Sequence, residues 1–204
     1  MNTKRAIETG DASALVELLR IQPSLANALI TWGVHDHLQS HPLHFICDML
    51  FEGVLERGRE RALAAALVSA GADINFRQGD PLNAAASLGA TEVGLLLLDA
   101  GAEPNGSGHI GETALHWAAN TGNAVLVRRL LDAGALVDSR DAKYNSTPLG
   151  WALHGWDETP PPGNLGHHHD VVVRLVRTGA VVDPEWTRTA DADGRLDVLA
   201  ALRG

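Results

Sequence analysis

The chain has 204 residues, of which 45% are apolar and 20% are charged, an ordinary composition for a globular protein. Its 16 basic and 25 acidic side chains give a formal charge of −9, and the absence of any Lys/Arg run argues against a nucleic-acid partner. The longest apolar stretches, such as Leu95–Leu98, are too short to span a bilayer, and the single Cys47 excludes an intrachain disulfide. We therefore expect a cytoplasmic protein without a membrane partner, and Met1–Gly10 carries no apolar secretory signal.

The first predicted element is a pair of short helices within residues 1–28. Its central part reads AIETGDASALVELLR over Ala6–Arg20, and Gly10 marks the turn, because glycine tolerates the left-handed backbone of a helix end. The connection that follows, Leu29–Ser40, is longer than the other connections between helix pairs, and we expect it to be extended. Such irregular segments of a repeated fold often mark its binding side.

Two histidines in this connection are candidates for a metal site. His35 and His37 alternate along an extended segment, so both imidazoles face one side and suit zinc or iron, with Asp48 as a possible third ligand. No spacing as specific as His-Glu-x-x-His is present. We therefore expect no bound metal and no cofactor, and retain His35 and His37 as weak candidates.

A short phrase then recurs four times along the chain. It reads HPLHFIC from His41, DPLNAAA from Asp80, TALHWAA from Thr113 and TPLGWAL from Thr147, at steps of 39, 33 and 34 residues. Each phrase predicts one helix, and a second predicted helix follows it and ends at a Gly-Ala pair. Self-similarity at this period is the signature of stacked repeats. The four repeats cover residues 41–72, 80–102, 113–135 and 147–180.

The residue types in the phrase have local physical roles. Thr113 and Thr147 are suited to cap the first helix of their repeats, and Pro148 fits the first turn, where a missing N–H costs nothing. Gly122 is placed to end the first helix of its repeat. The second helix, expected over residues 124–132, carries its apolar residues at helical spacing.

The segment Gly111–Asp138, GETALHWAANTGNAVLVRRLLDAGALVD, resembles the ankyrin repeat nearly residue for residue, and the other copies resemble it more loosely. The resemblance implies an all-α repeat fold, a solenoid of helix-turn-helix units joined by hairpin fingers. It implies about five repeats, counting residues 1–28 as the first, and a C-terminal cap over residues 186–204. We expect these to form a single domain over residues 1–204.

Two repeats are longer than the others. From the start of the phrase to Gly-Ala there are 21 residues in the repeats that begin at Asp80 and Thr113, but 30 after His41 and 32 after Thr147. In the second repeat we expect Phe51–Arg59 to lengthen the helices or the turn between them. In the fifth, Trp156–His169 is rich in Pro and Gly and is predicted to be a loop, with its three histidines in solvent.

The resemblance also implies which side chains face the concave groove. Asp48, Ser87, Asn120 and His154 follow the phrase in successive repeats and form a polar row. The predicted binding residues combine this row with aromatic and finger positions: Trp117, Trp151, His154, Asn120, Asp48, Ser87, Glu112, Tyr144 and Trp156. Two plainer readings remain open, namely that the row is an ordinary solvated helix face and that the tryptophans fill the seam between repeats. His44 and His116 are expected to hydrogen-bond backbone near the hairpins.

The function that these features favour is recognition of a protein or peptide through the groove and fingers. The alternative is a small-molecule or catalytic pocket, possibly metal-assisted, in the His/Trp-rich groove and closed by the insertions of the second and fifth repeats. The sequence lacks G-x-S-x-G, phosphate-loop and G-x-G-x-x-G motifs. We therefore assign no catalytic residue and favour a binding protein over an enzyme.

Overall fold

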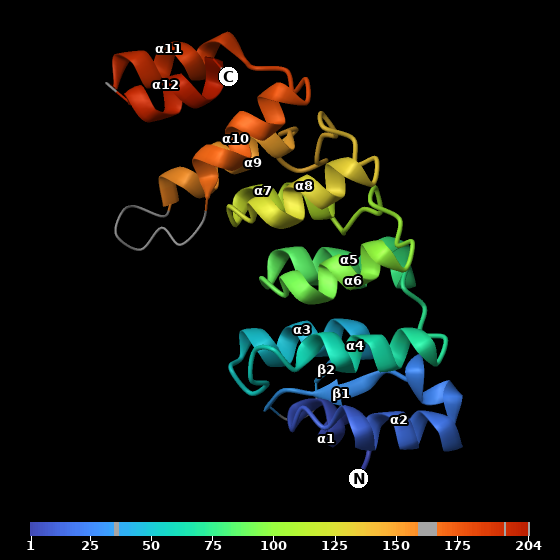
Figure 1. Cartoon of the computed structure of the whole chain (residues 1–204). Coiled ribbons are helices and arrows are strands. Elements are labelled where there is room, and N and C mark those ends of the chain that lie inside the picture. Colours follow the sequence, from blue (N-terminus) through green and yellow to red (C-terminus); the bar gives the residue numbers. More distant parts are fainter. Residues whose placement is uncertain (35–36, 159–166, 194, 204) are drawn as a thin grey trace. The chain divides into compact units, whose positions relative to one another are not determined.

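The computed structural model of the chain describes residues 1–34, 37–158, 167–193 and 195–203, and most of these are helical (Figure 1). Contacts between Cα atoms divide the chain into two compact units, Met1–Gly106 and Ser107–Gly204, which we call the N-terminal and C-terminal units and describe separately. The single domain expected over residues 1–204 stays a prediction. None of the described helices has the length and apolar character that crossing a membrane requires.

In its described residues, the N-terminal unit consists of successive pairs of helices. They are α1 (Thr3–Glu8), α2 (Ala12–Ile21), α3 (Pro42–Phe51), α4 (Glu60–Ser69), α5 (Phe76–Ser87) and α6 (Thr91–Asp99), with a 3-10 turn η1 (Pro23–Ala26) after α2. The first helices of the pairs, α1, α3 and α5, pack on one another, and so do the second helices, α2, α4 and α6 (Figure 1). Like helices therefore stack on like, as a repeated sequence predicts.

Helical spacing of apolar residues explains which faces of these helices are buried. Leu15 and Leu19 of α2, and Leu63 and Leu67 of α4, lie four residues apart and are at most 3% exposed. In α5 the buried residues include the small Ala84–Ala86, which let neighbouring helices approach closely. Burying a leucine side chain stabilises the fold by about 1.5–3 kcal/mol, so these faces supply much of what holds the pairs together.

The connection Leu29–Ser40, expected to be extended, contains a two-stranded hairpin. Strand β1 (Ile30–Trp32) pairs antiparallel with β2 (Leu38–Ser40), with Thr31 opposite Gln39. The hairpin precedes α3 directly. It is the finger that the repeat pattern predicts between the first and second pairs.

The C-terminal unit continues the paired arrangement in its described residues. Its helices are α7 (Ala114–Asn120), α8 (Ala124–Asp132), α9 (Pro148–Glu158), α10 (His168–Arg177), α11 (Pro184–Ala192) and α12 (Leu196–Arg203). Helix α7 packs on α9, and α8 packs on α10, which in turn contacts α12. The last pair, α11 and α12, occupies the segment expected to be a C-terminal cap.

The helix ends follow the local chemistry of the repeated phrase. Thr113 forms a capping box with His116, and Thr147 Oγ1 accepts the Gly150 N–H over 3.3 Å. At the other end, the Ala of each Gly-Ala pair donates its N–H at 2.9–3.0 Å to a leucine carbonyl five residues earlier, in turn Leu67, Leu97, Leu130 and Leu175. The preceding glycines have φ of 85–102°, the left-handed backbone that this end requires.

The two longer repeats differ in where their extra residues lie. In the second repeat, α3 ends at Phe51 and α4 begins at Glu60, so the added residues form a turn. In the fifth, α9 extends to Glu158 and α10 begins at His168, and residues 159–166 lie outside the described part of the chain. Part of the segment predicted to be a loop, Trp156–His169, is therefore helical.

The prediction that all three histidines of this segment lie in solvent is wrong for His168. Its side chain is 2% exposed and its Nε2 lies 2.8 Å from the carbonyl oxygen of Asn120, whereas His167 and His169 are exposed. Asn120 is the last residue of α7, and the last carbonyls of a helix have no partner within it. His168 supplies a partner from α10, in the next helix pair, which explains why it is buried.

Candidate binding site

A cavity of about 660 Å³ in the C-terminal unit gathers most of the predicted binding residues. We call it the aromatic pocket, and its lining consists of Ile110, Trp117, Asn120, Lys143, Tyr144, Ser146, Gly150, Trp151 and His154. Five residues of this lining were predicted from the sequence: Trp117, Asn120, Tyr144, Trp151 and His154. They come from α7, from α9 and from the finger between α8 and α9.

Three aromatic rings form the apolar part of the pocket. The Trp117 and Trp151 ring centroids lie 4.9 Å apart at an interplanar angle of 86°, and Tyr144 meets Trp151 at 6.4 Å and 70°. Both pairs are edge-to-face, an arrangement that stabilises aromatic contacts beyond their buried area. Trp151 is 9% exposed and innermost, whereas Tyr144 is 61% exposed. Trp151 therefore both packs between repeats and lines the pocket, so the two readings of this residue are compatible.

The residue that organises the pocket, Asp141, was not among the predicted ones. Its Oδ1 accepts the backbone N–H groups of Lys143 at 2.9 Å and Tyr144 at 2.6 Å. Its Oδ2 accepts the Ser146 N–H at 3.1 Å and the indole Nε1–H of Trp151 at 3.0 Å. One carboxylate thus fixes the finger that carries Tyr144 and also holds the innermost ring.

Asp141 is ionised in this setting. The side chain is only 2% exposed, and burial opposes its charge, but the four N–H donors outweigh burial and hold the pKa of the carboxyl below its ordinary value. A sequence signal for this role exists. Asp commonly accepts backbone N–H groups two residues ahead in turns, and Asp141 stands two residues before Lys143 in a finger without regular structure.

His116 links α7 to the same finger. Its Nδ1 accepts the Thr113 N–H at 3.0 Å, and its Nε2 lies 3.3 Å from the Ser146 carbonyl oxygen. Burial lowers the pKa of His116 in spite of the contact with Ser146, so the imidazole is neutral near pH 7. The backbone role expected for His116 is confirmed, and its ring meets Trp151 edge-on with centroids 5.4 Å apart.

The other predicted residues of this unit take different positions. Asn120 lines the pocket and donates from Nδ2 to the Trp151 carbonyl at 3.3 Å, while His154 is exposed at its rim. Glu112 is 9% exposed and accepts the Ile110 N–H at 2.9 Å, so it shapes the pocket wall without lining it. Trp156 lies outside the lining and meets the His169 ring at 6.1 Å.

In the N-terminal unit, Asp48 and Ser87 are engaged by their own surroundings. Asp48 is 9% exposed and accepts the Ser40 hydroxyl at 2.8 Å. The Ser87 hydroxyl donates to the Ala84 carbonyl at 3.3 Å. A polar row that joins these two residues to the pocket residues of the C-terminal unit stays a prediction.

The backbone role expected for His44 is wrong, because this histidine bridges two carboxylates. Its Nδ1 lies 2.8 Å from Asp80 Oδ2 and its Nε2 lies 3.5 Å from Asp48 Oδ1. Burial disfavours the charged imidazole, but the hydrogen bonds to Asp48 and Asp80 outweigh it and raise the pKa of His44 to about 9. His44 is therefore a cation at neutral pH and joins α3 to the start of the next repeat.

This bridge makes the stability of the protein depend on alkaline pH. Because the folded-state pKa of about 9 exceeds the unfolded value of 6.5, the stabilisation is complete below pH 6.5 and is lost as pH rises through 9. We expect a loss of about 2 kcal/mol over this range, since His44 is partly exposed and its ion pairs are screened. Urea unfolding of the wild type and of His44→Gln between pH 6.5 and 9.5 measures it. The wild type should fall more steeply, and parallel pH profiles would contradict the prediction.

The metal candidates of the sequence are only partly described. His35 lies outside the described residues, and His37 Nδ1 lies 2.5 Å from the Val34 carbonyl oxygen. Among the residues that the structure describes, no three His, Cys, Asp or Glu side chains gather as metal ligands. The candidate metal role of His35 and His37 therefore stays a prediction.

A comparison with known families identifies one segment of the chain. Residues 110–142 match the family model described as Ankyrin repeat. The chain thus contains an ankyrin repeat. The matched segment contains the pocket residues Ile110, Trp117 and Asn120 together with Asp141. The matched repeat thus supplies one side of the aromatic pocket, and the other lining residues, from Lys143 to His154, follow it in the chain.

Three relatives share parts of the chain. A protein of Danio rerio named "Putative palmitoyltransferase ZDHHC13" is 33% identical over 110 residues, which are 54% of this chain and 15% of that protein. "Palmitoyltransferase Hip14" of Drosophila melanogaster is 39% identical over 82 residues, 40% of this chain and 10% of its own length. A "Putative ankyrin repeat-containing protein" of Treponema pallidum (strain Nichols) is 42% identical over 77 residues, 36% of this chain and 26% of the relative. The chain therefore matches about a quarter or less of each relative.

Proposed function

We propose that this ankyrin repeat protein recognises a segment of a partner protein and that the aromatic pocket is the centre of the contact. The observation that carries the proposal is the convergence of Trp117, Trp151 and Tyr144 on one open cavity of about 660 Å³. Large rings with little rotamer freedom are the side chains that most often anchor protein interfaces. Ankyrin repeats generally mediate contacts between proteins, which supports the same reading.

The lining also suggests the chemistry of the segment. The rings of Trp117 and Tyr144 favour an apolar side chain, whereas the Asn120 amide and the exposed His154 imidazole are placed to hydrogen-bond the backbone around it. Lys143 Nζ lies 4.8 Å from the Tyr144 ring centroid, so the ring already has a cation from this chain and does not need one from the ligand. The proposed ligand is therefore a peptide segment with an apolar anchor residue, and not a nucleic acid or a membrane.

The finer features of the proposal extend beyond the pocket. We include about five repeats with a C-terminal cap in one domain, a cytoplasmic location, and additional contacts along the row that contains Asp48 and Ser87. Glu112 acts by shaping the pocket wall, and Trp156 belongs to the outer part of the surface. Acyl transfer is not part of the proposal. The chain matches 15% of one named palmitoyltransferase and 10% of the other, which is too small a share to carry over their activity.

Selection of peptides tests the pocket. A displayed library of random peptides is enriched on the wild-type protein, and the enriched peptides are then titrated against Trp117→Ala. Loss of a central aromatic anchor costs about 2 kcal/mol or more, so we expect affinity to fall about 30-fold. Phe51→Ala is the matched control, because Phe51 is 66% exposed and lies in the N-terminal unit.

Two results would count against the proposal. Peptides that bind Trp117→Ala as tightly as the wild type, with both proteins folded by circular dichroism, would exclude the pocket as the anchor site. A small-molecule screen in which a metabolite, and no peptide, requires Trp117 would instead support the alternative of a small-ligand pocket.

A further inference from the structure

Several arginines in the described part of the chain have a carboxylate of this chain beside them. Six guanidinium groups lie within ion-pair distance of Asp or Glu, those of Arg5, Arg20, Arg59, Arg61, Arg188 and Arg195. Arg128, Arg174 and Arg177 differ from these. Within the described residues, the guanidinium groups of these three have neither an ion pair nor a hydrogen bond.

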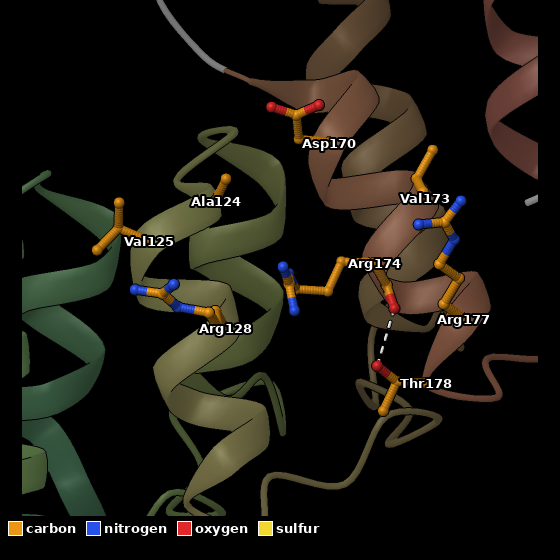
Figure 2. Close-up of a pocket in the computed structure, with 8 residues that line it drawn as sticks. All are labelled: Ala124, Val125, Arg128, Asp170, Val173, Arg174, Arg177 and Thr178. Carbon is orange, nitrogen blue, oxygen red and sulfur yellow. Dashed lines mark hydrogen bonds between the residues drawn. The ribbon is translucent and has the colours of Figure 1, made fainter.

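These three arginines line one cavity of about 450 Å³ between α8 and α10. We call it the arginine cleft, and its lining consists of Ala124, Val125, Arg128, Asp170, Val173, Arg174, Arg177 and Thr178. In Figure 2 the Arg174 side chain extends from α10 toward α8, while the guanidinium groups of Arg128 and Arg177 are drawn at the outer edges of their own helices. All three arginines are exposed, so their long side chains are free to turn toward a ligand.

The charge of the cleft runs against that of the chain. The chain has a formal charge of −9, yet three arginines face one aspartate in this lining, a formal surplus of two positive charges. Arg174 and Arg177 are three residues apart on α10, where like charges destabilise a helix. Asp170 is itself close to two imidazoles, with His167 Nδ1 at 3.8 Å and His169 Nδ1 at 3.5 Å. A bound anion would relieve the repulsion.

We propose that the arginine cleft binds the phosphate group of a phosphorylated serine or threonine side chain. A phosphate monoester carries a charge of about −1.5 to −2 at pH 7, which matches the surplus, and its oxygens suit the planar donor forks of guanidinium groups. The Thr178 hydroxyl does not add a donor, because it donates to the Arg174 carbonyl at 2.8 Å (Figure 2). Val125 and Val173 supply apolar walls for the carbon atoms that carry the phosphate.

The size and position of the cleft favour a side chain on a partner over a free ion. A volume of about 450 Å³ falls within the range of ligand sites, about 300–1,000 Å³, and exceeds what a phosphate group fills alone. The lining comes from α8 and α10, whereas the aromatic pocket is lined by α7, α9 and their fingers. The proposal is therefore independent of the function proposed for the aromatic pocket.

Titration of the whole protein with N-acetyl-phosphoserine amide tests the proposal. The methyl signals of Val125 and Val173 are followed by NMR, and they should shift in a saturable way that weakens at higher ionic strength. We expect Arg174→Gln to weaken the binding at least tenfold, since hydrogen bonds between charged partners are strong. Arg20→Gln removes the same charge from an exposed site on α2 and should change the affinity less than twofold.

Three further probes separate the sources of the anion. N-acetyl-glutamate amide and N-acetyl-serine amide should bind at least tenfold more weakly than the phosphoserine probe, and inorganic phosphate should also bind more weakly. Equal binding of glutamate would overturn the assignment to phosphate, and equal binding of inorganic phosphate would overturn the phosphorylated side chain. The same affinity in Arg174→Gln, or no saturable shift, would overturn the site itself. Trp117→Ala should leave the titration unchanged.

Discussion

Replacing Asp141 by Ala is expected to lower the free energy of unfolding by about 3 kcal/mol and to abolish peptide binding at the aromatic pocket. The carboxylate accepts three backbone N–H groups of the finger and the Trp151 indole N–H. An unpaired buried donor costs about 1–3 kcal/mol, and hydrogen bonds to a charged group are among the stronger ones. In Asp141→Ala the N–H groups of Lys143, Tyr144 and Ser146 would lose the carboxylate that accepts them.

Asp141→Asn serves as the matched variant, because it keeps one acceptor oxygen and the shape of the side chain. It should retain the backbone bonds of one oxygen and lose those of the other, so its stability should lie between those of the wild type and Asp141→Ala. Urea unfolding followed by tryptophan fluorescence measures both variants. An Asp141→Ala protein that is within 1 kcal/mol of wild type and still binds the selected peptides would contradict the role assigned to Asp141.

The ionised state of Asp141 adds a dependence on acid pH. Because its pKa is lower in the folded protein than in the unfolded chain, its stabilisation is present above pH 4 and is lost as pH falls through the folded-state value. His41 acts in the same direction, since burial lowers the pKa of its imidazole to about 4 despite the nearby Asp73 and Asp80. Its contribution is present above pH 6.5 and is lost as pH falls toward 4.

The fold could be predicted because the signals that define it are local. A capping Thr, a proline in the first turn and a Gly-Ala pair at the second helix end act within one repeat, and Thr113, Thr147 and the Gly-Ala pairs take these roles. The helix pairs then follow from apolar spacing. The segment just before Asp80 shows the limit of this local reading, because Arg77 and Gln78 adopt a left-handed backbone that their residue types do not predict.

The site could be predicted only where the position in the repeat determines the surroundings. Asn120 and His154 occupy equivalent positions of successive repeats, and so do Trp117 and Trp151, so the repeat sets their orientation and their gathering was foreseeable. His44 occupies the same position as His116 but meets Asp80, 36 residues away, where His116 meets a backbone carbonyl. The role of each histidine therefore depends on the group that the next repeat places beside it, and the sequence pattern within one repeat does not predict that group.

The burial of His168 and the role of Gly155 have the same origin. Both lie in the helix pair α9–α10 and meet the backbone of Asn120 in the preceding pair, at separations of 48 and 35 residues along the chain. A glycine inside a predicted helix is the sequence signal for such a close approach of two backbones. Glycine destabilises a helix by about 1 kcal/mol relative to Ala, so its presence there indicates that a larger side chain does not fit.

The close approach of α9 to α7 gives the second large prediction. A Cβ added at Gly155 would lie 2.8 Å from the carbonyl carbon of Asn120 and closer still to its oxygen. These are backbone atoms of α7, so they cannot rotate away, and the two helices would have to separate. We expect Gly155→Ala to lower the free energy of unfolding by about 3 kcal/mol, an overpacking cost that exceeds the gain in helix propensity.

Gly150→Ala is the control on the same helix. A Cβ at Gly150 would meet the Ser146 hydroxyl, which can rotate, and would lie 3.5 Å from the Trp186 ring, an ordinary contact. Its stability should stay within about 1 kcal/mol of wild type, since the propensity gain offsets a mild crowding. Urea unfolding of the two variants in parallel gives the comparison. Equal stabilities would show that α7 and α9 can move apart freely, and the aromatic pocket that they build would then not be a rigid site.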